Sequence, residues 1–576
     1  MNIYLDLEAN GLDPDVIHCV GLAIDDGPVL LLRTREQLEQ VLCRCKGARL
    51  YAHNGIKYDF PVLTRVWGID LDGFLLADSM VMAQFLNFSN AGSFSLDNLS
   101  RLVGEYKGSY DAGWEVYTDA MGAYCKQDVK ALRAIVKRLE PEITGEGAIE
   151  LEYMVQAEIS KQLSRGWLLD VRKASTLLGG LVDRKMEVED EVRTVFKPVA
   201  VPVKEVEPKT KKDGTLSAVG LKYLGERALD VVGGVHTRVD WQEFNLGSRQ
   251  QIGERLIRAG WNPTDFTETG QPKVDETTLE GVDIPEAQLI CEYLMLEKRI
   301  GMLNSWLEAA DSEGVVRGRI NICGARTHRM THSNPNLAQV TSSRKPYGKE
   351  MRECWIARPG YKLVGWDAEG LELRMLAHYM ADPEYAERVV TGSQEEGTDV
   401  HTTNQHAAGL PDRDAAKTFI YAFMYGAGDA KIGSIVGKGR AEGSRLKARF
   451  LQRTPALKSL KERVERAASR GYIKSLDGRH LITVEYKALN TLLQGGGSIV
   501  MKRALVILAE HVRKFELDVH FVGNIHDEVQ AEVRPDDIPM YEECVHKAIK
   551  QAGEFYNLRV PMAAKVHVGD SWAETH

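Results

Sequence analysis

The sequence predicts a multidomain α/β protein, and three observations support this prediction. The chain has 576 residues, well beyond the roughly 250–300 residues at which single hydrophobic cores stop growing. Apolar residues make up 44% and charged residues 27% of the chain, as in ordinary globular proteins. Strand-like and helix-like hydrophobic patterns mix near both ends, whereas the middle of the chain is strongly helical.

The first 145 or so residues predict an α/β domain. Runs of strand character occur at residues 2–8, 18–24, 28–33 and 48–54. Helical patterns occur at 57–67, 77–87 and 119–139. From about residue 146 a different architecture is expected.

The middle of the chain predicts long helices, to about residue 196 and again at 248–260 and 285–311. Residues 198–240 break this pattern because they are rich in proline and lysine, which predicts an insertion or mobile loop between helices. After about residue 313 the pattern is mixed, with strands expected at 362–366, 520–526 and 529–533.

Composition indicates a cytoplasmic protein without a membrane partner. The longest uncharged apolar stretches are far too short to span a bilayer, and the N-terminus lacks the basic-then-apolar pattern of an export signal. The 8 cysteines are scattered, which favours reduced thiols.

The net charge of −9 argues against a nucleic-acid partner only if it is taken alone. A chain that holds metal ions must carry acids, and the local distribution of charge matters more than the sum. Two basic clusters are present: Lys204, Lys209, Lys211 and Lys212, then Lys438, Arg440, Arg445, Lys447, Arg449 and Arg453. Such runs are usually solvated faces, so composition leaves the partner open.

A first group of acids lies in the N-terminal domain. Asp6 and Glu8 are two apart on an expected strand, so their side chains leave the same face. Asp59 follows where a strand ends and a helix begins, and Tyr124 and Asp128 are four apart on an expected helix. Grouped acids repel one another unless cations compensate, so a pair of Mg²⁺ or Mn²⁺ ions is the natural interpretation. Two such ions suit phosphodiester chemistry.

A stripe of cations and rings lies in the run RDAAKTFIYAFMYGAG. Arg413, Lys417, Tyr421 and Tyr425 are four residues apart, so they share one face of a helix. Fixed cations suit a triphosphate, and flat rings suit a sugar and a base pair. The alternative is a solvated face beside the edge of an apolar core.

A second group of acids lies in the C-terminal half. Asp367 follows the strand expected at 362–366, and Asp527 lies near the turn of an expected hairpin. If these two segments are neighbours, the two carboxylates would hold two metal ions in the same manner as the first group. Turns that contain aspartate are common, so the second segment alone is a weak signal.

The order and spacing of Asp6, Glu8, Asp59, Tyr124 and Asp128 resemble the DEDD 3′–5′ exonucleases of proofreading domains, in the subtype with tyrosine. The resemblance implies a ribonuclease-H-like fold in which the four carboxylates hold the metals and Tyr124 orients the attacking water. A domain that has lost its activity is the alternative, although no ligand is missing.

The three later segments, in this order, resemble the polymerase motifs of family A, the DNA polymerase I family. The match is closest to the replicative polymerases of podovirus-type bacteriophages, and it extends to GRINICGARTHRMTHSNPNLAQV, VHTTNQ, ALNTLLQGGG and the terminal SWAETH. The resemblance implies template-directed DNA synthesis with 3′–5′ proofreading, with two metals at both sites. It also implies replication of a phage genome in the cytoplasm of the bacterial host.

The resemblance further implies a division of the chain into domains. An exonuclease at 1–145 would precede a right-hand polymerase with its thumb at 146–312 (insertion 198–240), its palm at 313–382 and 476–576, and its fingers at 383–475.

Site roles follow from the same resemblance. Asp367, Asp527 and the Ala368 carbonyl would bind two Mg²⁺ ions, with Mn²⁺ as an alternative. The incoming triphosphate would be contacted by His401, Arg413 and Lys417, and Lys417 would also protonate the pyrophosphate. Tyr421 would pack on the sugar and Tyr425 near the templating base, while Glu372 would exclude a 2′-hydroxyl. The expected DNA contacts are Arg329, Gln494 and His526.

Two residues depart from the family pattern. His328 stands where the family usually has glycine, beside the expected DNA contact Arg329. Glu369 stands where serine is usual, and it adds a negative charge two positions from Asp367. Both departures leave the catalytic groups in place. Tyr421 rather than phenylalanine implies that dideoxynucleotides are accepted.

The implied partners are primer–template DNA and deoxynucleoside triphosphates, with a phage helicase–primase as a further candidate. The insertion at 198–240 lies where phage relatives bind host thioredoxin, although its lysines would also suit direct contact with duplex phosphates. Two rival functions are a nuclease with an inactive polymerase and a DNA-binding scaffold. Nucleotide incorporation, with metal-free and Asp527→Ala controls, separates all three.

Overall fold

The computed structural model describes residues 1–89, 92–206, 210–218 and 236–576. These residues form two compact units. The first unit combines Met1–Asp170 with Ala309–His576, and the second is Val171–Glu308.

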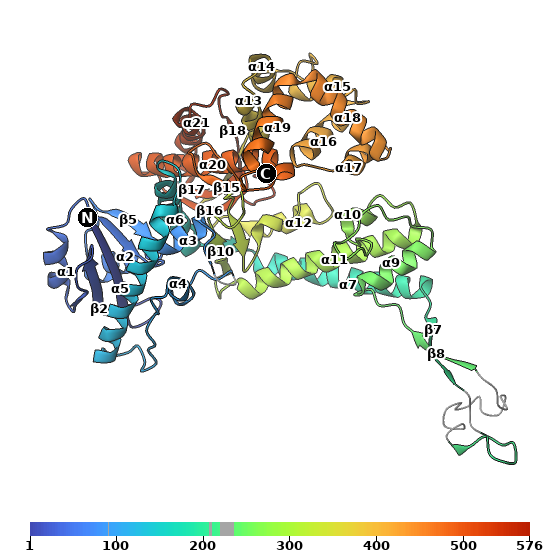
Figure 1. Cartoon of the computed structure of the whole chain (residues 1–576), viewed down its shortest axis with the longest axis horizontal. Helices are drawn as coiled ribbons and strands as arrows, with labels where there is room; N and C mark the ends of the chain where they lie inside the picture. The colour runs from blue at the N-terminus through green and yellow to red at the C-terminus, as the bar shows by residue number, and fades with distance from the viewer. Residues whose placement is uncertain (90–91, 207–209, 219–235) are drawn as a thin grey trace. The chain divides into compact units, whose positions relative to one another are not determined.

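The first unit begins with a five-stranded sheet in the order β3-β2-β1-β4-β5 (Figure 1). Its strands are β1 (Asn2–Ala9), β2 (Ile17–Ile24), β3 (Leu30–Leu32), β4 (Arg49–Ala52) and β5 (Leu75–Asp78). β1 is central, since it pairs antiparallel with β2 and parallel with β4. The strands expected in this region are therefore confirmed, and the central one carries Asp6 and Glu8.

The helices expected at 57–67, 77–87 and 119–139 are confirmed as α2, α3 and α5, and the structure adds α1 and α4, which the sequence patterns miss. Their bounds are α1 (Arg35–Leu42), α2 (Asp59–Trp67), α3 (Ser79–Phe85), α4 (Leu96–Val103) and α5 (Asp119–Leu139). α5 begins at a cap in which the Thr118 hydroxyl accepts the Met121 amide. Its apolar face contacts β1 and β2, which places the polar residues of α5 at the edge of the sheet.

The long helices expected between about residues 146 and 196 are confirmed as two helices, with a short strand between them that the sequence patterns miss. α6 (Ala148–Arg165) ends at Gly166, and the strand β6 (Trp167–Leu169) separates it from α7 (Val171–Val195). Gly166 has φ 65°, a left-handed conformation, and a Cβ there would lie 2.5 Å from Val315 Cγ1. The chain turns at this glycine, so β6 can pair with β9 (Val315–Val316) and β12 (Trp355–Ile356).

A second sheet forms the centre of the C-terminal half. Its order is β16-β17-β13-β18, and each neighbouring pair is antiparallel. The strands are β16 (Val519–Ile525), β17 (Glu528–Val533), β13 (Lys362–Ala368) and β18 (Ala564–Gly569), and the helices α20 (Ala488–Lys514) and α21 (Ile538–Phe555) pack nearby. In the described part of the chain only the helical stretch Glu485–Lys514 is long and apolar enough to cross a membrane, and 83% of its most apolar window is buried. It is therefore a core helix of this unit.

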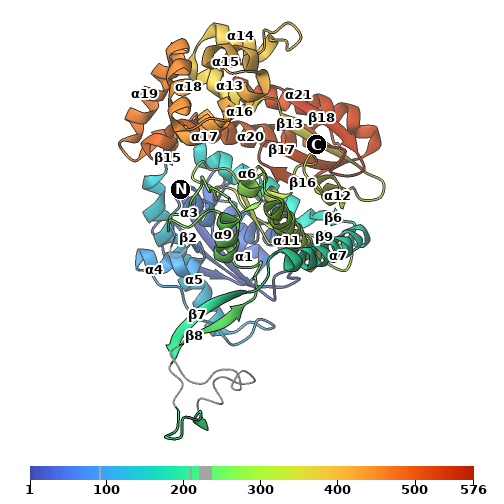
Figure 2. The ribbon, with the colours of Figure 1, turned by 90° about the vertical axis from the view of Figure 1, so that its right-hand side faces the viewer.

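Seven α-helices and a short hairpin lie between β13 and α20 in the chain, and Figure 2 labels these helices. They are α13 (Leu371–Met380), α14 (Pro383–Thr391), α15 (Val400–Ala408), α16 (Arg413–Met424), α17 (Asp429–Ser434), α18 (Arg440–Arg453) and α19 (Pro455–Ala468), then β14 (Tyr472–Lys474) and β15 (His480–Ile482). Phe419 and Phe423 on α16 pack edge-on against Phe450 of α18, with ring centroids 5.1 and 5.4 Å apart. This contact buries one face of α16 and leaves the other open.

Before β13 lie β10 (Arg319–Asn321), β11 (Thr331–Ser333) and α12 (Gly348–Arg352).

The second unit is mainly helical, with α7, α9 (Arg249–Arg258), α10 (Glu276–Leu279) and α11 (Pro285–Ala309). The expectation of a loop at 198–240 is wrong at both ends, because β7 (Val199–Val206) and β8 (His236–Gln242) pair as an antiparallel ribbon. The alternating valines of β7 favour a strand. Residues 207–209, with the predicted basic residue Lys209, and 219–235 lie outside the described residues, as does the side chain of Lys204.

A buried ionic network joins distant segments of the first unit. Glu152 of α6 accepts from Arg479 Nη1 at 2.6 Å and from Lys502 Nζ of α20 at 2.7 Å. The side chains of Glu152 and Arg479 are fully buried. Burial alone would raise the pKa of Glu152, but Lys502 and Arg479 lower it to about 2. The network therefore holds an ionised carboxylate inside the fold.

Glu152→Gln should lower the stability of the chain by roughly 3 kcal/mol, because it leaves the buried Lys502 ammonium without its carboxylate and leaves Arg479 with Asp477 as its remaining acidic partner. Glu150→Gln, on the same helix but in a partly exposed pair with Arg49, should cost less than about 1 kcal/mol. Denaturant midpoints of the full chain measure both. Because the folded-state pKa of Glu152 is lowered, its stabilisation is present above the unfolded pKa and is lost as the pH falls toward 2. Equal midpoints for the two variants would contradict this role.

Candidate functional site

The first group of acids converges at one end of the five-stranded sheet. Asp6 and Glu8 leave β1 on the same face, and their carboxylates lie within 4.8 Å of each other and of Cys125 Sγ. Asp59 is the first residue of α2, and Asp128 lies on α5. We call Asp6, Glu8, Asp59 and Asp128 the first carboxylate site. Its members come from three elements, as the sequence predicts.

Burial, followed by mutual repulsion, raises the pKa values of the carboxyl groups at this site. The pKa of Asp6 is raised well above its usual range by burial and then by the charges of Glu8, Asp59 and Asp128. Burial followed by the Asp128 charge raises the pKa of Glu8 to about 8, and burial followed by Asp78 raises that of Asp59 to about 7. Asp128 Oδ1 is buried without a hydrogen-bond partner among the described residues. Carboxylates in this state fit divalent cations, which prefer oxygen ligands.

Tyr124 faces the same site from α5, beside a lysine that the sequence patterns do not reveal. Lys107 Nζ lies 2.9 Å from Asp128 Oδ2 and 4.9 Å from the centroid of the Tyr124 ring. The rings of Tyr110 and Trp114 pack against Tyr124, at 5.8 and 6.2 Å. Lys107 lies in an irregular loop, where no periodicity indicates its direction.

Asp78 is a second residue that the sequence patterns miss. It caps α3 by accepting the Met80 amide at 2.9 Å, and it also accepts the amides of Asn54 and Ile56 at 2.9 and 3.2 Å. These bonds fix the loop that leads into Asp59. An aspartate before a helix is a recognisable cap signal, but its bonds to the distant loop follow only from the fold.

Asp367 and Asp527 are neighbours, as the sequence predicts, and we call them the second carboxylate site. Asp367 is opposite Glu528 in the β13–β17 ladder, and the Ala368 amide donates to the Asp527 carbonyl at 3.0 Å. His526 and Asp527 form the two-residue turn between β16 and β17, with His526 at φ 59°. The hairpin therefore presents Asp527 beside the end of β13.

Both carboxyl groups of the second site have raised pKa values. Burial is the main cause for each. Glu372 raises the pKa of Asp527 further, and Lys565 and His576 oppose the shift of Asp367. Two adjacent carboxylates that are destabilised in their charged form fit a divalent cation, as at the first site.

Glu372 links the second carboxylate site to the helix α16. It lies in the first turn of α13, and its Oε1 accepts from Arg329 Nη2 at 2.9 Å and from the Tyr425 hydroxyl at 3.4 Å. Burial followed by the charge of Glu372 raises the pKa of Tyr421 to about 12, with a smaller contribution from Asp527. Arg329, expected to contact DNA, is here paired with Glu372.

The predicted stripe lies on the open face of α16. Arg413, Lys417 and Tyr421 are exposed or half-buried, whereas the opposite face is buried. Tyr425 follows the last residue of the helix, Met424, and its ring centroid lies 6.3 Å from that of Tyr421. The stripe therefore forms as expected, except that its last ring caps the helix.

Asp399 anchors the cationic end of this stripe, and the sequence patterns miss it. Its carboxylate accepts from Arg413 Nε at 3.2 Å and from the His401 amide at 2.8 Å. Burial opposes ionisation, but these hydrogen bonds lower the pKa of Asp399 to about 2. His401 lies beside the stripe, with its ring 6.3 Å from that of Tyr421. The cap signal of Asp399 before α15 is visible in the sequence, but its pairing with Arg413 is not.

The remaining predicted residues are close to these elements. Gln494 is half-buried on α20, and His526 Nε2 lies 3.3 Å from the Ala338 carbonyl oxygen. Ala368 is the last residue of β13 and is buried. Beside them Glu528 accepts from Trp572 Nε1 at 2.5 Å and pairs with His576 at 2.7 Å. The C-terminal segment therefore covers this edge of the second sheet.

The departure at Glu369 has a local counter-charge. Its Oε2 lies 3.4 Å from Arg374 Nη2, and its carbonyl accepts from Arg374 Nε at 2.7 Å. The added acid is therefore paired, although it lies only two residues from Asp367.

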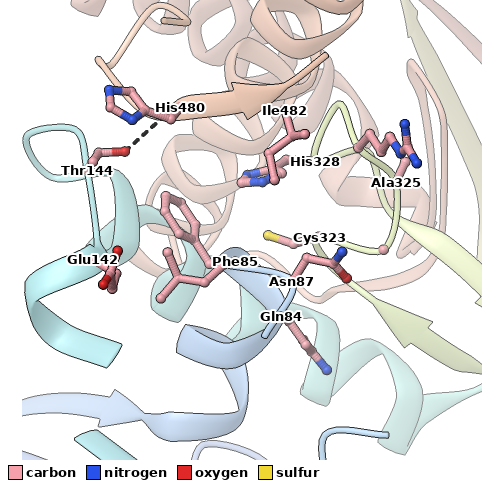
Figure 3. Close-up of a pocket in the computed structure, with 13 residues that line it drawn as sticks. Gln84, Phe85, Asn87, Glu142, Thr144, Cys323, Ala325, His328, His480 and Ile482 are labelled. Atoms are coloured by element: carbon pink, nitrogen blue, oxygen red, sulfur yellow. Dashed lines mark hydrogen bonds between the residues drawn. The ribbon is translucent and has the colours of Figure 1, made fainter. Parts of the chain in front are cut away.

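The departure at His328 has a backbone signature and a set of contacts. His328 has φ 54°, in the left-handed region that favours glycine. Its ring meets Phe85 of α3 edge-on at 4.9 Å, and its Nδ1 lies 3.1 Å from Arg479 Nη1. Figure 3 shows His328, Phe85 and Cys323 around a pocket of about 270 Å³. Thr144 and His480 also line this pocket, and the His480 amide donates to the Thr144 hydroxyl at 2.9 Å.

Comparisons with known proteins agree with this geometry. The family model described as DNA polymerase family A matches residues 222–574. The chain is 32% identical to the DNA-directed DNA polymerase of Escherichia phage T7, over 100% of both chains. It is 41% identical to that of Escherichia phage Phieco32, over 54% of this chain and 64% of the other.

A solved structure shares the fold. It is the POL domain of Pol1 from M. smegmatis, in complex with a DNA primer-template and dNTP. The TM-score is 0.76 at 18% identity, and the match covers 100% of this chain and 96% of that one. Given the family match and the full-length similarity to the phage enzyme, the chain belongs to DNA polymerase family A.

Proposed function

We propose that this chain, a DNA-directed DNA polymerase of family A, extends a primer at the second carboxylate site and shortens it at the first, in the replication of a phage genome. The observation that carries the proposal is the placement of Asp367 and Asp527 beside Glu372, which contacts the end of the α16 stripe. Carboxylates for metal ions, cations for phosphates and rings for a nucleoside thus belong to one surface.

In synthesis, the primer 3′-hydroxyl attacks the α-phosphorus of a deoxynucleoside triphosphate, the bond to the β-phosphate breaks, and pyrophosphate leaves. Arg413, Lys417 and His401 would bind the triphosphate, and Lys417, which is exposed on the stripe, would donate a proton to the pyrophosphate. Tyr421 and Tyr425 would pack on the sugar and the templating base. Glu372, held by Arg329 and Tyr425, would exclude a 2′-hydroxyl.

In excision, a water molecule attacks the terminal phosphodiester, the bond to the 3′-oxygen of the preceding nucleotide breaks, and a nucleoside monophosphate leaves. Tyr124 would orient that water from its place beside Asp128. The domain division would place the exonuclease at 1–145, the thumb at 146–312, the palm at 313–382 and 476–576, and the fingers at 383–475.

Both sites suit divalent cations. Asp6, Glu8, Asp59 and Asp128 would hold two ions at the first site, and Asp367, Asp527 and the Ala368 carbonyl would hold two at the second. When bound, Mg²⁺ or Mn²⁺ supplies positive charge that activates the nucleophile and stabilises the leaving oxygen.

Primer–template DNA and deoxynucleotides are the proposed partners, in the cytoplasm of an infected bacterium. Arg329, Gln494 and His526 would contact the DNA. The ribbon of β7 and β8 would hold duplex DNA or host thioredoxin, and a phage helicase–primase is a further candidate. Longer products on addition of thioredoxin in primer extension would favour the protein partner over the direct contact.

Substitution at the two carboxylate sites should separate the activities. Asp527→Ala should lower primer extension by more than about 1,000-fold, because the remaining carboxylate cannot hold the cations alone. It should leave shortening of the primer without deoxynucleotides intact, and Asp6→Ala should have the reverse effect. A labelled primer–template with Mg²⁺ measures both activities. Loss of both activities in either variant would contradict the assignment of separate sites.

Asp399→Asn should raise the KM for deoxynucleotides, because the neutral amide no longer holds the Arg413 guanidinium. Asparagine remains a good helix cap, so α15 should persist. Asp382→Asn is a matched control, since Asp382 caps α14 by accepting the Tyr385 amide. Steady-state kinetics should show several-fold weaker nucleotide use for the first variant only, and an equal KM in both would refute the anchoring role.

Tyr421→Phe should increase discrimination against dideoxynucleotides by at least about tenfold, which corresponds to roughly 1.4 kcal/mol. The resemblance to family A implies that tyrosine here accepts both sugars. The measurement is competition between a dideoxy- and a deoxynucleotide in primer extension. A wild-type chain that already strongly prefers deoxynucleotides would be inconsistent with this role.

A further inference from the structure

Lys107 occupies a loop that is anchored on both sides of the first carboxylate site. Its backbone amide donates to Ser100 Oγ of α4 at 3.1 Å. Gln127 of α5 donates to Glu105 Oε1 at 2.9 Å and to the Tyr106 carbonyl at 2.8 Å. These bonds fix the backbone just before the lysine. The anchored backbone therefore sets the direction in which the Lys107 side chain leaves the loop.

The lysine touches two groups that excision would use. Its Nζ pairs with Asp128 Oδ2 at 2.9 Å and lies 4.9 Å from the Tyr124 ring centroid. The backbone of the next residue, Gly108, packs closely against Tyr124, because a Cβ added to Gly108 would lie 3.1 Å from Tyr124 Cδ2. The Asp128 side chain is only 3% exposed, so this is a partly desolvated pair rather than a surface ion pair.

The positive charge of Lys107 acts on several carboxylates of the first site. Lys107 opposes the repulsion that raises the pKa of Asp6, Glu8 and Asp128. One ammonium group cannot balance four carboxylates, so it does not replace divalent cations. It does leave Asp128 Oδ1 free of hydrogen bonds while it holds Oδ2.

We propose that Lys107 is a positioning residue of the excision site. Its ammonium group holds the Asp128 carboxylate and the Tyr124 ring in a fixed relation, so that the metal-binding and water-orienting groups are aligned before cations and DNA bind. This proposal rests on the proposed exonuclease function.

Two opposite effects follow when the charge is removed. The site becomes more negative, so divalent cations bind more tightly. The alignment of Asp128 and Tyr124 is lost, so hydrolysis becomes slower even when the cations are saturating. A residue that merely stabilised the fold would lower both quantities together.

Lys107→Met should slow excision of a single-stranded primer by about 10- to 100-fold at saturating Mn²⁺. Lys107→Arg should restore part of the rate, because a guanidinium keeps the charge. Lys130→Met is the matched control, since Lys130 is exposed on α5 two residues from Asp128 and should change nothing. Primer extension should be equal in all of these full-length chains.

Binding of Mn²⁺ is the second readout, measured from the electron paramagnetic resonance signal of the free ion. All chains carry Asp367→Asn and Asp527→Asn in this titration, so that the first site dominates. Lys107→Met should bind Mn²⁺ several-fold more tightly than its parent.

Unchanged excision in Lys107→Met would overturn the proposal, and so would weaker Mn²⁺ binding together with slow excision, which would indicate a purely structural lysine. If the wild-type chain does not shorten the primer at all, the exonuclease function itself fails, and the role of Lys107 fails with it.

Discussion

Burial of ionisable carboxyl groups is the constraint on which both sites of this chain depend. The first site gathers four acids from β1, α2 and α5, and the second joins the end of β13 to the β16–β17 turn. In each, burial is the main cause of the raised pKa values. Such acids stay together only because a central strand and well-packed helices leave them no other position. Carboxyl groups in this state suit divalent cations, which we propose both sites bind.

The cationic side chains near the two sites differ in the acids with which they pair. At the first, Lys107 is paired directly with a carboxylate of the site. At the second, the nearby arginines are tied to other acids, since Arg329 pairs with Glu372 and Arg413 with Asp399. Lys565, opposite Asp367 in the β13–β18 ladder, is a cation that acts on that carboxylate, while the anchored guanidinium of Arg413 and the exposed Lys417 lie on the face of α16 proposed to meet phosphates.

Local periodicity explains how much the sequence could predict. Asp6 and Glu8 alternate along a strand, and Arg413, Lys417 and Tyr421 repeat along a helix, so their shared faces follow from the chain alone. The second sheet's hairpin was expected for the same reason. Hydrophobic periodicity cannot predict the roles of Lys107, Asp78 and Asp399. Each of these side chains contacts a residue on another element of the fold. Local patterning also missed the short strand β6, which follows Gly166 and is defined by its pairing with the distant strands β9 and β12.

His328 shows how the two halves of the first unit are joined. Its left-handed backbone costs roughly 1 kcal/mol that glycine would avoid. The side chain offsets this cost through Phe85 of α3 and Arg479 of the buried network, while Ser498 of α20 donates to its carbonyl at 2.9 Å. The next residue is Arg329, which holds Glu372. Contacts from α3 to His328 and from Arg329 to Glu372 therefore connect the N-terminal sheet to the second carboxylate site through two adjacent residues.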